Sequence, residues 1–193
     1  MPGKIRGILL AAGYSKRFGS NKLLQALPPG SPEAGVPIAL ASARRLLEAL
    51  PDAITVVRPR AQKLATQLRN AGCNTVVCKG AAEGMGTSLA AGVRAAADAE
   101  GWVVALADMP FIRPETIRSV VRALEGGAGI AAPAYHGQRG HPVGFARSYF
   151  EELSALSGDQ GARELLQRHA ASVSLCETDD PGVLRDIDKP SDL

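Results

Sequence analysis

A regular alternation of short apolar runs with helix-like segments is the feature that most constrains how this chain folds. The expected strands lie at residues 5–11, 53–57, 75–78, 102–107, 129–133, 142–146 and 172–176, and the expected helices at residues 38–50, 60–71, 87–99, 114–125, 148–156 and 161–169. Strand–helix alternation over this length predicts a three-layer α/β/α sandwich around a mostly parallel sheet.

The run at residues 102–107 is continuously apolar, which is typical of a central parallel strand covered on both faces. In sheets of this kind the ligand crevice lies outside the carboxyl ends of the strands. Residues that directly follow the expected strands are therefore the first candidates for chemistry.

Length and charge narrow the function classes. The chain has 193 residues, which suits a single domain over residues 1–193, and its formal net charge is +3. That charge is too small to favour nucleic acid, because a nucleic-acid face usually shows a stripe of Lys and Arg with stacking aromatics. Any anion site must therefore be local.

Two further patterns bear on location. The three cysteines, Cys73, Cys78 and Cys176, have no metal-ligand spacing, and their dispersion fits a reducing compartment. No apolar run is long enough for a signal segment or a membrane span. We expect a cytoplasmic protein with neither nucleic acid nor membrane as a partner.

The loop at residues 10–22 has the composition of a phosphate-binding site. It follows an expected buried strand, so its backbone N–H groups can point into the crevice, and Gly13 and Gly19 permit close approach of phosphate oxygens. Arg17 offers a planar fork of donors, while Lys16 and Lys22 offer point charges. The alternative is a solvated basic loop whose glycines serve only for turning.

The glycine spacing excludes two familiar nucleotide motifs. Five residues separate Gly13 from Gly19, whereas a Walker loop has four between its glycines and then Lys and Ser or Thr. Gly84 and Gly86 give only the first half of the Gly-x-Gly-x-x-Gly fingerprint, which argues against a dinucleotide-binding redox protein.

Acidic residues mark two further positions. Asp108 leaves the expected central strand, where a carboxylate that faces the crevice needs a partner or a cation; the alternative is an Asp in an ordinary turn. Asp186 and Asp188 are two apart, so on an extended strand they point the same way, although a solvated acidic tail has the same pattern. Taken alone, His141 fits either a functional residue or a structural residue in a turn beside proline. Arg163 is equally ambiguous, because its segment is also a good helix start.

Taken together, these motifs resemble those of the MobA-like nucleotidyltransferase family, and within it most resemble the molybdenum cofactor cytidylyltransferases. The matching segments, in chain order, are Leu-Ala-Ala-Gly-x-Ser-x-Arg-Phe-Gly-x-x-Lys at 10–22, Glu-Gly-Met-Gly-x-Ser-Leu at 83–89, Ala-Asp-Met-Pro at 107–110, Arg-Gly-His-Pro-Val-Gly at 139–144, Gly-Asp-x-Gly-Ala-Arg at 158–163 and Asp-Ile-Asp-x-Pro-x-Asp-Leu at 186–193. The first and third are specific for the superfamily, and the Gly-His-Pro and Gly-Asp segments narrow it to the cytidylyltransferase-like branch.

The resemblance implies a Rossmann-like fold of the nucleotide-diphospho-sugar transferase type. It also implies transfer of CMP from CTP to the phosphate of the molybdenum cofactor with release of pyrophosphate, dependent on Mg²⁺ or alternatively Mn²⁺. A molybdoenzyme or its chaperone is the implied protein partner. The alternatives are a GTP-using or other small-phosphate nucleotidyltransferase of the same fold, and a non-catalytic cofactor-binding chaperone.

The resemblance also assigns roles to individual residues. The implied catalytic residues are Arg17, Lys22 and Asp108. The implied nucleotide contacts are Leu10, Ala11, Ala12, Gly13, Arg17, Lys22, Gly84 and Ser88. Asp108 and Asp188 would bind the metal, with Asp186 as an alternative to Asp188, and His141 and Arg163 would face the acceptor.

Ala12 bears on the choice of nucleotide. Guanylyltransferase relatives tend to have Gly-Gly where this chain has Ala12-Gly13, and the Ala form is similar to the cytidine-using branch. A methyl group near the base would disfavour a purine by on the order of 1–3 kcal/mol.

Two segments depart from the family pattern. Lys79, Gly80 and Ala82 stand where relatives often have Asn-Pro and an aromatic, and Lys189 replaces the usual Thr of Asp-Thr-Pro. Asp108 is therefore expected to be a more secure metal ligand than Asp188.

Overall fold

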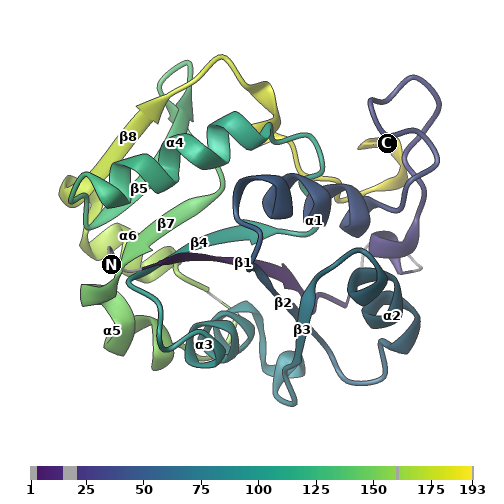
Figure 1. Cartoon of the computed structure of the whole chain (residues 1–193), viewed down its shortest axis with the longest axis horizontal. Helices are drawn as coiled ribbons and strands as arrows, with labels where there is room; N and C mark the ends of the chain where they lie inside the picture. Colours follow the sequence, from purple (N-terminus) through teal and green to yellow (C-terminus); the bar gives the residue numbers. More distant parts are fainter. Residues whose placement is uncertain (1–3, 15–20, 160, 193) are drawn as a thin grey trace.

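The computed structural model describes residues 4–14, 21–159 and 161–192, arranged as in Figure 1. The described residues form an eight-stranded sheet. Its strands are β1 (Ile5–Ala11), β2 (Ile54–Val57), β3 (Asn74–Val77), β4 (Gly101–Leu106), β5 (Ile130–Tyr135), β6 (Gln138–Arg139), β7 (Val143–Ala146) and β8 (Val173–Glu177).

The strands lie in the order β3-β2-β1-β4-β7-β5-β6, and β8 pairs with β5 outside this path. The half formed by β1 to β4 is parallel throughout. β7 then runs antiparallel to both β4 and β5, while β8 returns parallel to β5. The expected mostly parallel sheet is confirmed, with β7 reversed inside it and the short β6 reversed at its edge.

Helices cover both faces of this sheet (Figure 1). One face carries α1 (Ile38–Ala49), α2 (Gln62–Asn70) and α4 (Pro114–Glu125), and the other carries α3 (Met85–Ala95), α5 (Phe150–Ser154) and α6 (Arg163–Arg168). Short 3₁₀ turns connect these elements: η1 (Lys22–Leu24), η2 (Ala81–Glu83), η3 (Arg147–Tyr149), η4 (Ala170–Ser172), η5 (Pro181–Leu184) and η6 (Pro190–Asp192). The three-layer α/β/α sandwich is therefore confirmed.

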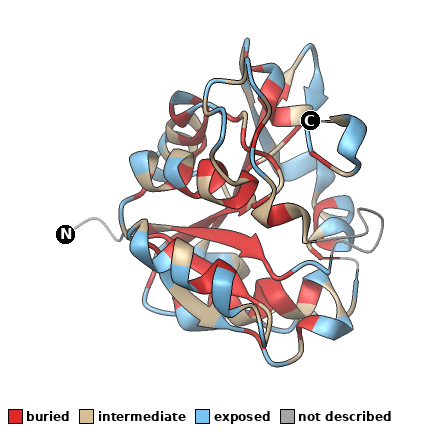
Figure 2. Cartoon of the chain, turned by 90° about the vertical axis from the view of Figure 1, so that its right-hand side faces the viewer, coloured by how far each residue is buried: buried red, intermediate tan, exposed pale blue. Residues whose placement is uncertain are grey.

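Strand β1 shows why these runs are apolar on both faces. Leu9 packs with α1 and α4 residues in one core cluster, whereas its neighbours Ile8 and Leu10 belong to the cluster under α3. Since side chains alternate across a strand, a sheet covered on both sides requires apolar residues at every position. Figure 2 shows the resulting concentration of buried residues in the strands and on the inward faces of the helices.

A glycine sets how closely α3 approaches the sheet. A Cβ atom at Gly92 would lie 2.8 Å from a methyl of Ile8 and 2.9 Å from a methyl of Val56. Glycine therefore permits close packing of α3 on β1 and β2 here.

The structure corrects three expected elements. α3 begins at Met85 after Gly84, not at the expected residue 87, because Gly84 has φ of +135° and makes the turn itself. The helix expected at residues 148–156 is divided into η3 and the short α5. Residues 186–188 belong to no strand, so the expected reason for Asp186 and Asp188 to point the same way does not hold.

Among the described residues, no helix combines the length and apolar character needed to cross a membrane.

Candidate active site at the carboxyl ends of the strands

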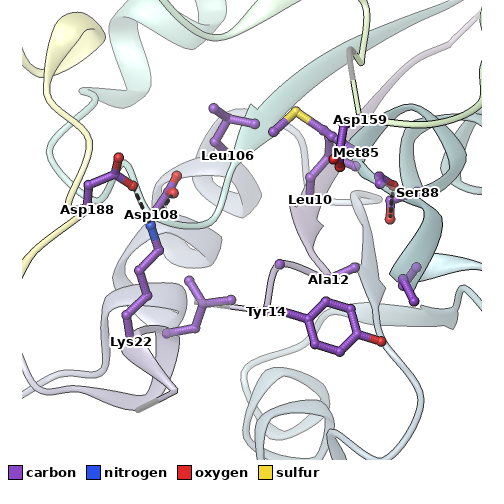
Figure 3. A pocket seen from close by; sticks show the side chains of 15 residues that line it. Leu10, Ala12, Tyr14, Lys22, Met85, Ser88, Leu106, Asp108, Asp159 and Asp188 are labelled. Carbon is purple, nitrogen blue, oxygen red and sulfur yellow. Dashed lines mark hydrogen bonds and ion pairs between the residues drawn. The ribbon is translucent and has the colours of Figure 1, made fainter. Parts of the chain in front are cut away.

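A pocket of about 450 Å³ opens where β1 and β4 end, the position expected for a ligand in a parallel sheet. Residues from five separate parts of the sequence line it, and Figure 3 shows them from close by. They are Leu10, Ala12, Gly13, Tyr14, Lys22, Leu23, Ala81, Ala82, Gly84, Met85, Ser88, Leu106, Asp108, Asp159 and Asp188. Figure 3 shows Lys22, Asp108 and Asp188 gathered on one side, the charged end, and Tyr14, Met85, Ser88 and Asp159 on the other, the open end.

The charged end is a lysine held between two carboxylates. Lys22 Nζ donates to Asp108 Oδ2 at 2.8 Å and to Asp188 Oδ1 at 3.0 Å. The lysine side chain is 12% exposed, and those of Asp108 and Asp188 are 23% and 37% exposed. Because all three are partly removed from water, the pairings are stronger than those of an exposed surface ion pair.

The two carboxylates influence the protonation of Lys22. Burial acts to lower the pKa of Lys22, but the hydrogen bonds and negative charges of Asp108 and Asp188 outweigh it and raise that pKa above its usual value. Lys22 is therefore a fully charged ammonium in this arrangement.

Main-chain hydrogen bonds fix Asp108 directly after β4. The Ala107 N–H donates to the carbonyl of Leu10 in β1 at 3.1 Å, and the Ser42 hydroxyl in α1 donates to the Ala107 carbonyl at 2.9 Å. The Asp108 carbonyl in turn accepts from the Ile187 N–H at 2.9 Å. That last bond joins the C-terminal segment to the end of the central strand.

Asp188 reaches Asp108 because Ile187 anchors the C-terminal segment. Ile187 is fully buried and packs with Leu27, Ile38 and Ala41 beside the start of α1. Immediately after it, the Asp192 carboxylate accepts from the N–H groups of Asp188 at 2.9 Å and Lys189 at 2.7 Å.

The Asp192 contacts also act on its own protonation. The backbone N–H donors of Lys189 and Asp188 stabilise the carboxylate and lower the pKa of Asp192. The charged form of Asp192 thus closes the turn that presents Asp188 to the pocket.

At the open end, the Gly84 turn packs directly on the segment at residues 157–159. The Gly86 N–H donates to the Gly158 carbonyl at 2.7 Å. A Cβ atom at Gly84 would lie 2.4 Å from Asp159 Oδ1 and from the Gly158 carbonyl. Glycine is required at position 84 both for its positive φ and for this close approach, which places the Asp159 carboxylate on the pocket wall.

Tyr14 forms the outer wall of the open end and is 45% exposed. The Arg58 guanidinium lies 4.6 Å from the centroid of its ring, and Arg58 also donates to the Gly13 carbonyl at 3.1 Å. The cation–π contact and the hydrogen bond together hold the ring against the end of β1. The ring is the most extended flat surface in the pocket lining.

Most of the sequence-predicted nucleotide residues lie together in this pocket. Leu10, Ala12, Gly13, Lys22, Gly84, Ser88, Asp108 and Asp188 line it, whereas Ala11 is 1% exposed within β1 and does not. Arg17, Lys16 and Gly19 lie outside the described residues.

The residues assigned to the acceptor do not line this pocket. His141 Nδ1 is buried and has no hydrogen-bond partner among the described residues. Burial, and then the positive charge of Arg139, lower the pKa of His141, while the negative charge of Asp108 acts in the opposite direction. Arg163 is exposed at the first position of α6.

Asp186 is exposed and lines a separate hollow with Tyr135 and Arg185, so Asp188 is the aspartate that meets Asp108.

Several pocket residues were not singled out from the sequence: Tyr14, Leu23, Ala81, Ala82, Met85, Leu106 and Asp159. Asp159 and Met85 lay inside the quoted motifs, so motif membership was a usable signal for both. Tyr14 carried no such signal, because it occupies a variable position of the first motif.

The donor set of the charged end fits a hard divalent cation. Both carboxylates already converge on one positive centre, and their oxygens are the ligand type that Mg²⁺ and Mn²⁺ prefer. Among the described residues there is no cluster of three or more His, Cys, Asp or Glu side chains that could hold a metal ion. Two carboxylates suffice for a cation of this kind, which commonly completes its shell with water and substrate phosphate.

Solved structures share this fold. The chain is similar to Rv0371c from Mycobacterium tuberculosis H37Rv, with a TM-score of 0.76 and 27% identity over 98% of this chain and 95% of that chain. Another structure of Rv0371C, a complex with manganese, matches at 25% identity with a TM-score of 0.74, again covering 98% and 95% of the two chains.

Two further proteins are similar over nearly their whole length. The purine catabolism protein PucB of Bacillus subtilis (strain 168) is 30% identical, covering 96% of this chain and 92% of PucB. The nicotine blue oxidoreductase of Paenarthrobacter nicotinovorans is 29% identical, covering 95% of this chain and 92% of that protein. The family model of the MobA-like NTP transferase domain matches residues 7–173. The chain therefore belongs to the MobA-like NTP transferase family of nucleotidyltransferases.

Proposed function

We propose that this nucleotidyltransferase uses CTP and the molybdenum cofactor as substrates, transferring CMP to the cofactor phosphate and releasing pyrophosphate. The observation that carries the proposal is the meeting of Lys22, Asp108 and Asp188 at one end of a pocket whose floor includes Ala12. Charge neutralisation and positioning are what phosphoryl-group chemistry requires of a protein, and the charged end supplies both.

In the proposed reaction, an oxygen of the acceptor phosphate attacks the α-phosphorus of CTP. The bond from that phosphorus to the bridging oxygen breaks, and pyrophosphate leaves with the electron pair. Lys22 and Arg17 would neutralise the phosphate oxygens, and Asp108 with Asp188 would hold a divalent cation, Mg²⁺ or Mn²⁺. When bound, that cation supplies Lewis-acid stabilisation of the charge on the phosphates.

The nucleotide contacts follow from the lining of the pocket. Leu10, Ala12 and Gly13 would cradle the nucleoside and phosphates from the end of β1, and Gly84 and Ser88 would face the ribose. The exposed Tyr14 ring offers a stacking surface for the base, since every nucleobase has a π-face. Asp159 offers a carboxylate acceptor for the amino group of cytosine, which uracil lacks.

The acceptor would approach from the side of the β5–β7 half of the sheet. His141 follows the β6 strand and is held by a hydrogen bond of 2.9 Å from its N–H to the Val183 carbonyl. Arg163 is an exposed guanidinium suited to a phosphate. We assign both residues to the acceptor, and a molybdoenzyme or its chaperone as the protein that receives the product.

The deciding experiment is a pyrophosphate-release assay with each of the four nucleoside triphosphates, with and without molybdenum cofactor, in Mg²⁺ or Mn²⁺. Release is expected only when CTP and the cofactor are both present. Equal turnover with GTP would overturn the cytidine assignment, and turnover with a different phosphate acceptor would overturn the cofactor assignment.

One observation favours a second candidate. A protein 29% identical over 95% of this chain bears the name of an oxidoreductase. The same assay mixtures should therefore be followed for oxidation of NADH and NADPH in the presence of nicotine blue. Dye-dependent oxidation without pyrophosphate release would favour redox chemistry over transfer.

A further inference from the structure

Lys22 holds the position between the two carboxylates that a divalent cation would also need. Its Nζ atom lies 2.8 Å from Asp108 Oδ2 and 3.0 Å from Asp188 Oδ1, so one ammonium uses an oxygen of each acid. An oxygen-liganded cation bound by both acids would draw on the same carboxylate pair. Two positive centres cannot share that space without strong repulsion, because both are partly shielded from solvent.

The ammonium is a strong competitor for this position. The lysine side chain is 12% exposed and contacts both acids at hydrogen-bond distance. The carboxylates become available to a cation when this side chain moves to another anionic partner.

The backbone of Lys22 is held in place, whereas its side chain faces the pocket. The Lys22 backbone is fixed as the first residue of η1, with the Gln25 N–H donating to its carbonyl at 3.0 Å. Its side chain, by contrast, lines the pocket and has a flexible four-carbon stem. A triphosphate in the pocket would offer that ammonium a new anionic partner.

We infer that Lys22 gates the acidic pair: the ammonium occupies the Asp108–Asp188 position in the nucleotide-free protein and yields it to a divalent cation when a triphosphate draws Lys22 away. This inference rests on the proposed function only in taking a nucleoside triphosphate as the ligand. By linkage, the nucleotide and the cation then promote each other's binding, and Lys22 is the residue that couples them. Lys22 acts here as a positioning residue as well as a phosphate partner.

The test measures Mn²⁺ binding to the full, nucleotide-free chain by titration calorimetry and by the electron paramagnetic resonance signal of free Mn²⁺. Lys22→Met removes the competing charge and should tighten Mn²⁺ binding at least tenfold. Lys22→Arg keeps the charge and should bind Mn²⁺ about as weakly as the wild type. Lys189→Met is the matched control, because it removes a positive charge next to Asp188 from a side chain that is exposed; it should change the affinity less than twofold.

Two outcomes would overturn the inference. One is Mn²⁺ binding to Lys22→Met that is no tighter than to the wild type. The other is equal tightening in Lys22→Met and Lys189→Met, which would make the effect one of general charge. Melting curves with and without Mn²⁺ check folding, and Lys22→Gln, which keeps a donor without the charge, carries the same expectation if the Met variant does not fold.

None of these measurements uses CTP or an acceptor. If pyrophosphate release failed to require CTP and the molybdenum cofactor, the proposed function would fall while the gating result stood. Conversely, an ungated acidic pair in an active cytidylyltransferase would leave the proposed function intact.

Discussion

The two ends of the pocket differ in how far their side chains are already satisfied. At the charged end, Lys22 bonds to both aspartates, and main-chain hydrogen bonds tie their two segments to each other. At the open end, Tyr14 and Met85 are 45% and 48% exposed. A ligand must exchange partners at the first end, but at the second it need only cover surface that already faces solvent.

This difference separates two kinds of contribution to function. In the proposed reaction, partner exchange at the charged end places charge beside the phosphates, so changes there should act mainly on rate. A ligand that covers the open end breaks few existing contacts, so changes there should act on nucleotide affinity and on which nucleotide is chosen. The following substitutions test this separation, beginning with the largest expected effect.

Asp108→Asn should lower the kcat/KM of transfer by about 10²–10³, because it removes a charge from the centre that neutralises and orients the phosphates. The amide keeps the size of the side chain, so the fold should be retained. Pyrophosphate release measures the effect, and Asp186→Asn is the matched control, since Asp186 is exposed and faces a different hollow. Equal losses in the two variants would contradict a special role for Asp108.

Ala12→Gly should raise the use of GTP relative to CTP by about tenfold or more, because it removes the methyl group proposed to crowd a purine. Ala12 is 4% exposed and lines the pocket, so its methyl group lies at the pocket floor. The ratio of kcat/KM for the two nucleotides is the measurement. An unchanged ratio would mean that position 12 does not select the base.

Tyr14→Ala should raise the KM for CTP by about fivefold, the lower end of what one base–aromatic stack contributes, with little change in kcat. Tyr14→Phe keeps the ring and should behave like the wild type. Arg58→Met should give a smaller increase, because it loosens the ring without removing it. A fall in kcat with an unchanged KM would place Tyr14 in the chemistry and break the separation between the two ends.

The sequence alone predicted the architecture because local patterns decide it. Apolar runs of strand length between helix-spaced segments require a covered parallel sheet, and Asp108 follows from the rule that ligands meet strand ends. The reversed direction of β7 could not be predicted in this way. The direction of a strand depends on the strands with which it pairs, and the apolar pattern of one strand does not show this pairing.

The sequence named many of the residues that line the pocket, but it did not indicate which of them bond to each other. Motif order indicated that Lys22, Asp108 and Asp188 belong to one site, yet no spacing shows that the lysine bonds to both acids across 86 and 166 residues. Tyr14 was missed because its orientation depends on Arg58, a residue 44 positions later. The start of α3 was placed two residues too late, because the positive φ of Gly84 makes the turn without a capping side chain.

The smallest expected effect is on the pH dependence of stability. It tests whether the charged end influences the loop that carries His141. Burial and the charge of Arg139 lower the pKa of His141, and Asp108 only partly opposes them. The unfolded chain therefore binds more protons than the folded one once the pH falls below about 6.5, the ordinary histidine value. The free energy of unfolding should decrease as the pH is lowered through that value, and it should stop decreasing below the folded pKa.

Urea unfolding at a series of pH values measures this slope, which for one proton is at most about 1.4 kcal/mol per pH unit. His141→Gln should flatten the curve below about pH 6.5. His136→Asn is the control, because His136 is exposed in the β5–β6 turn and its φ of +49° suits Asn. Asp108→Asn should steepen the dependence, since it removes the charge that favours protonated His141. If neither His141→Gln nor Asp108→Asn changes the curve, the charged end and this loop are electrostatically independent. The region that hydrogen bonds join around Asp108 would then end at the C-terminal segment.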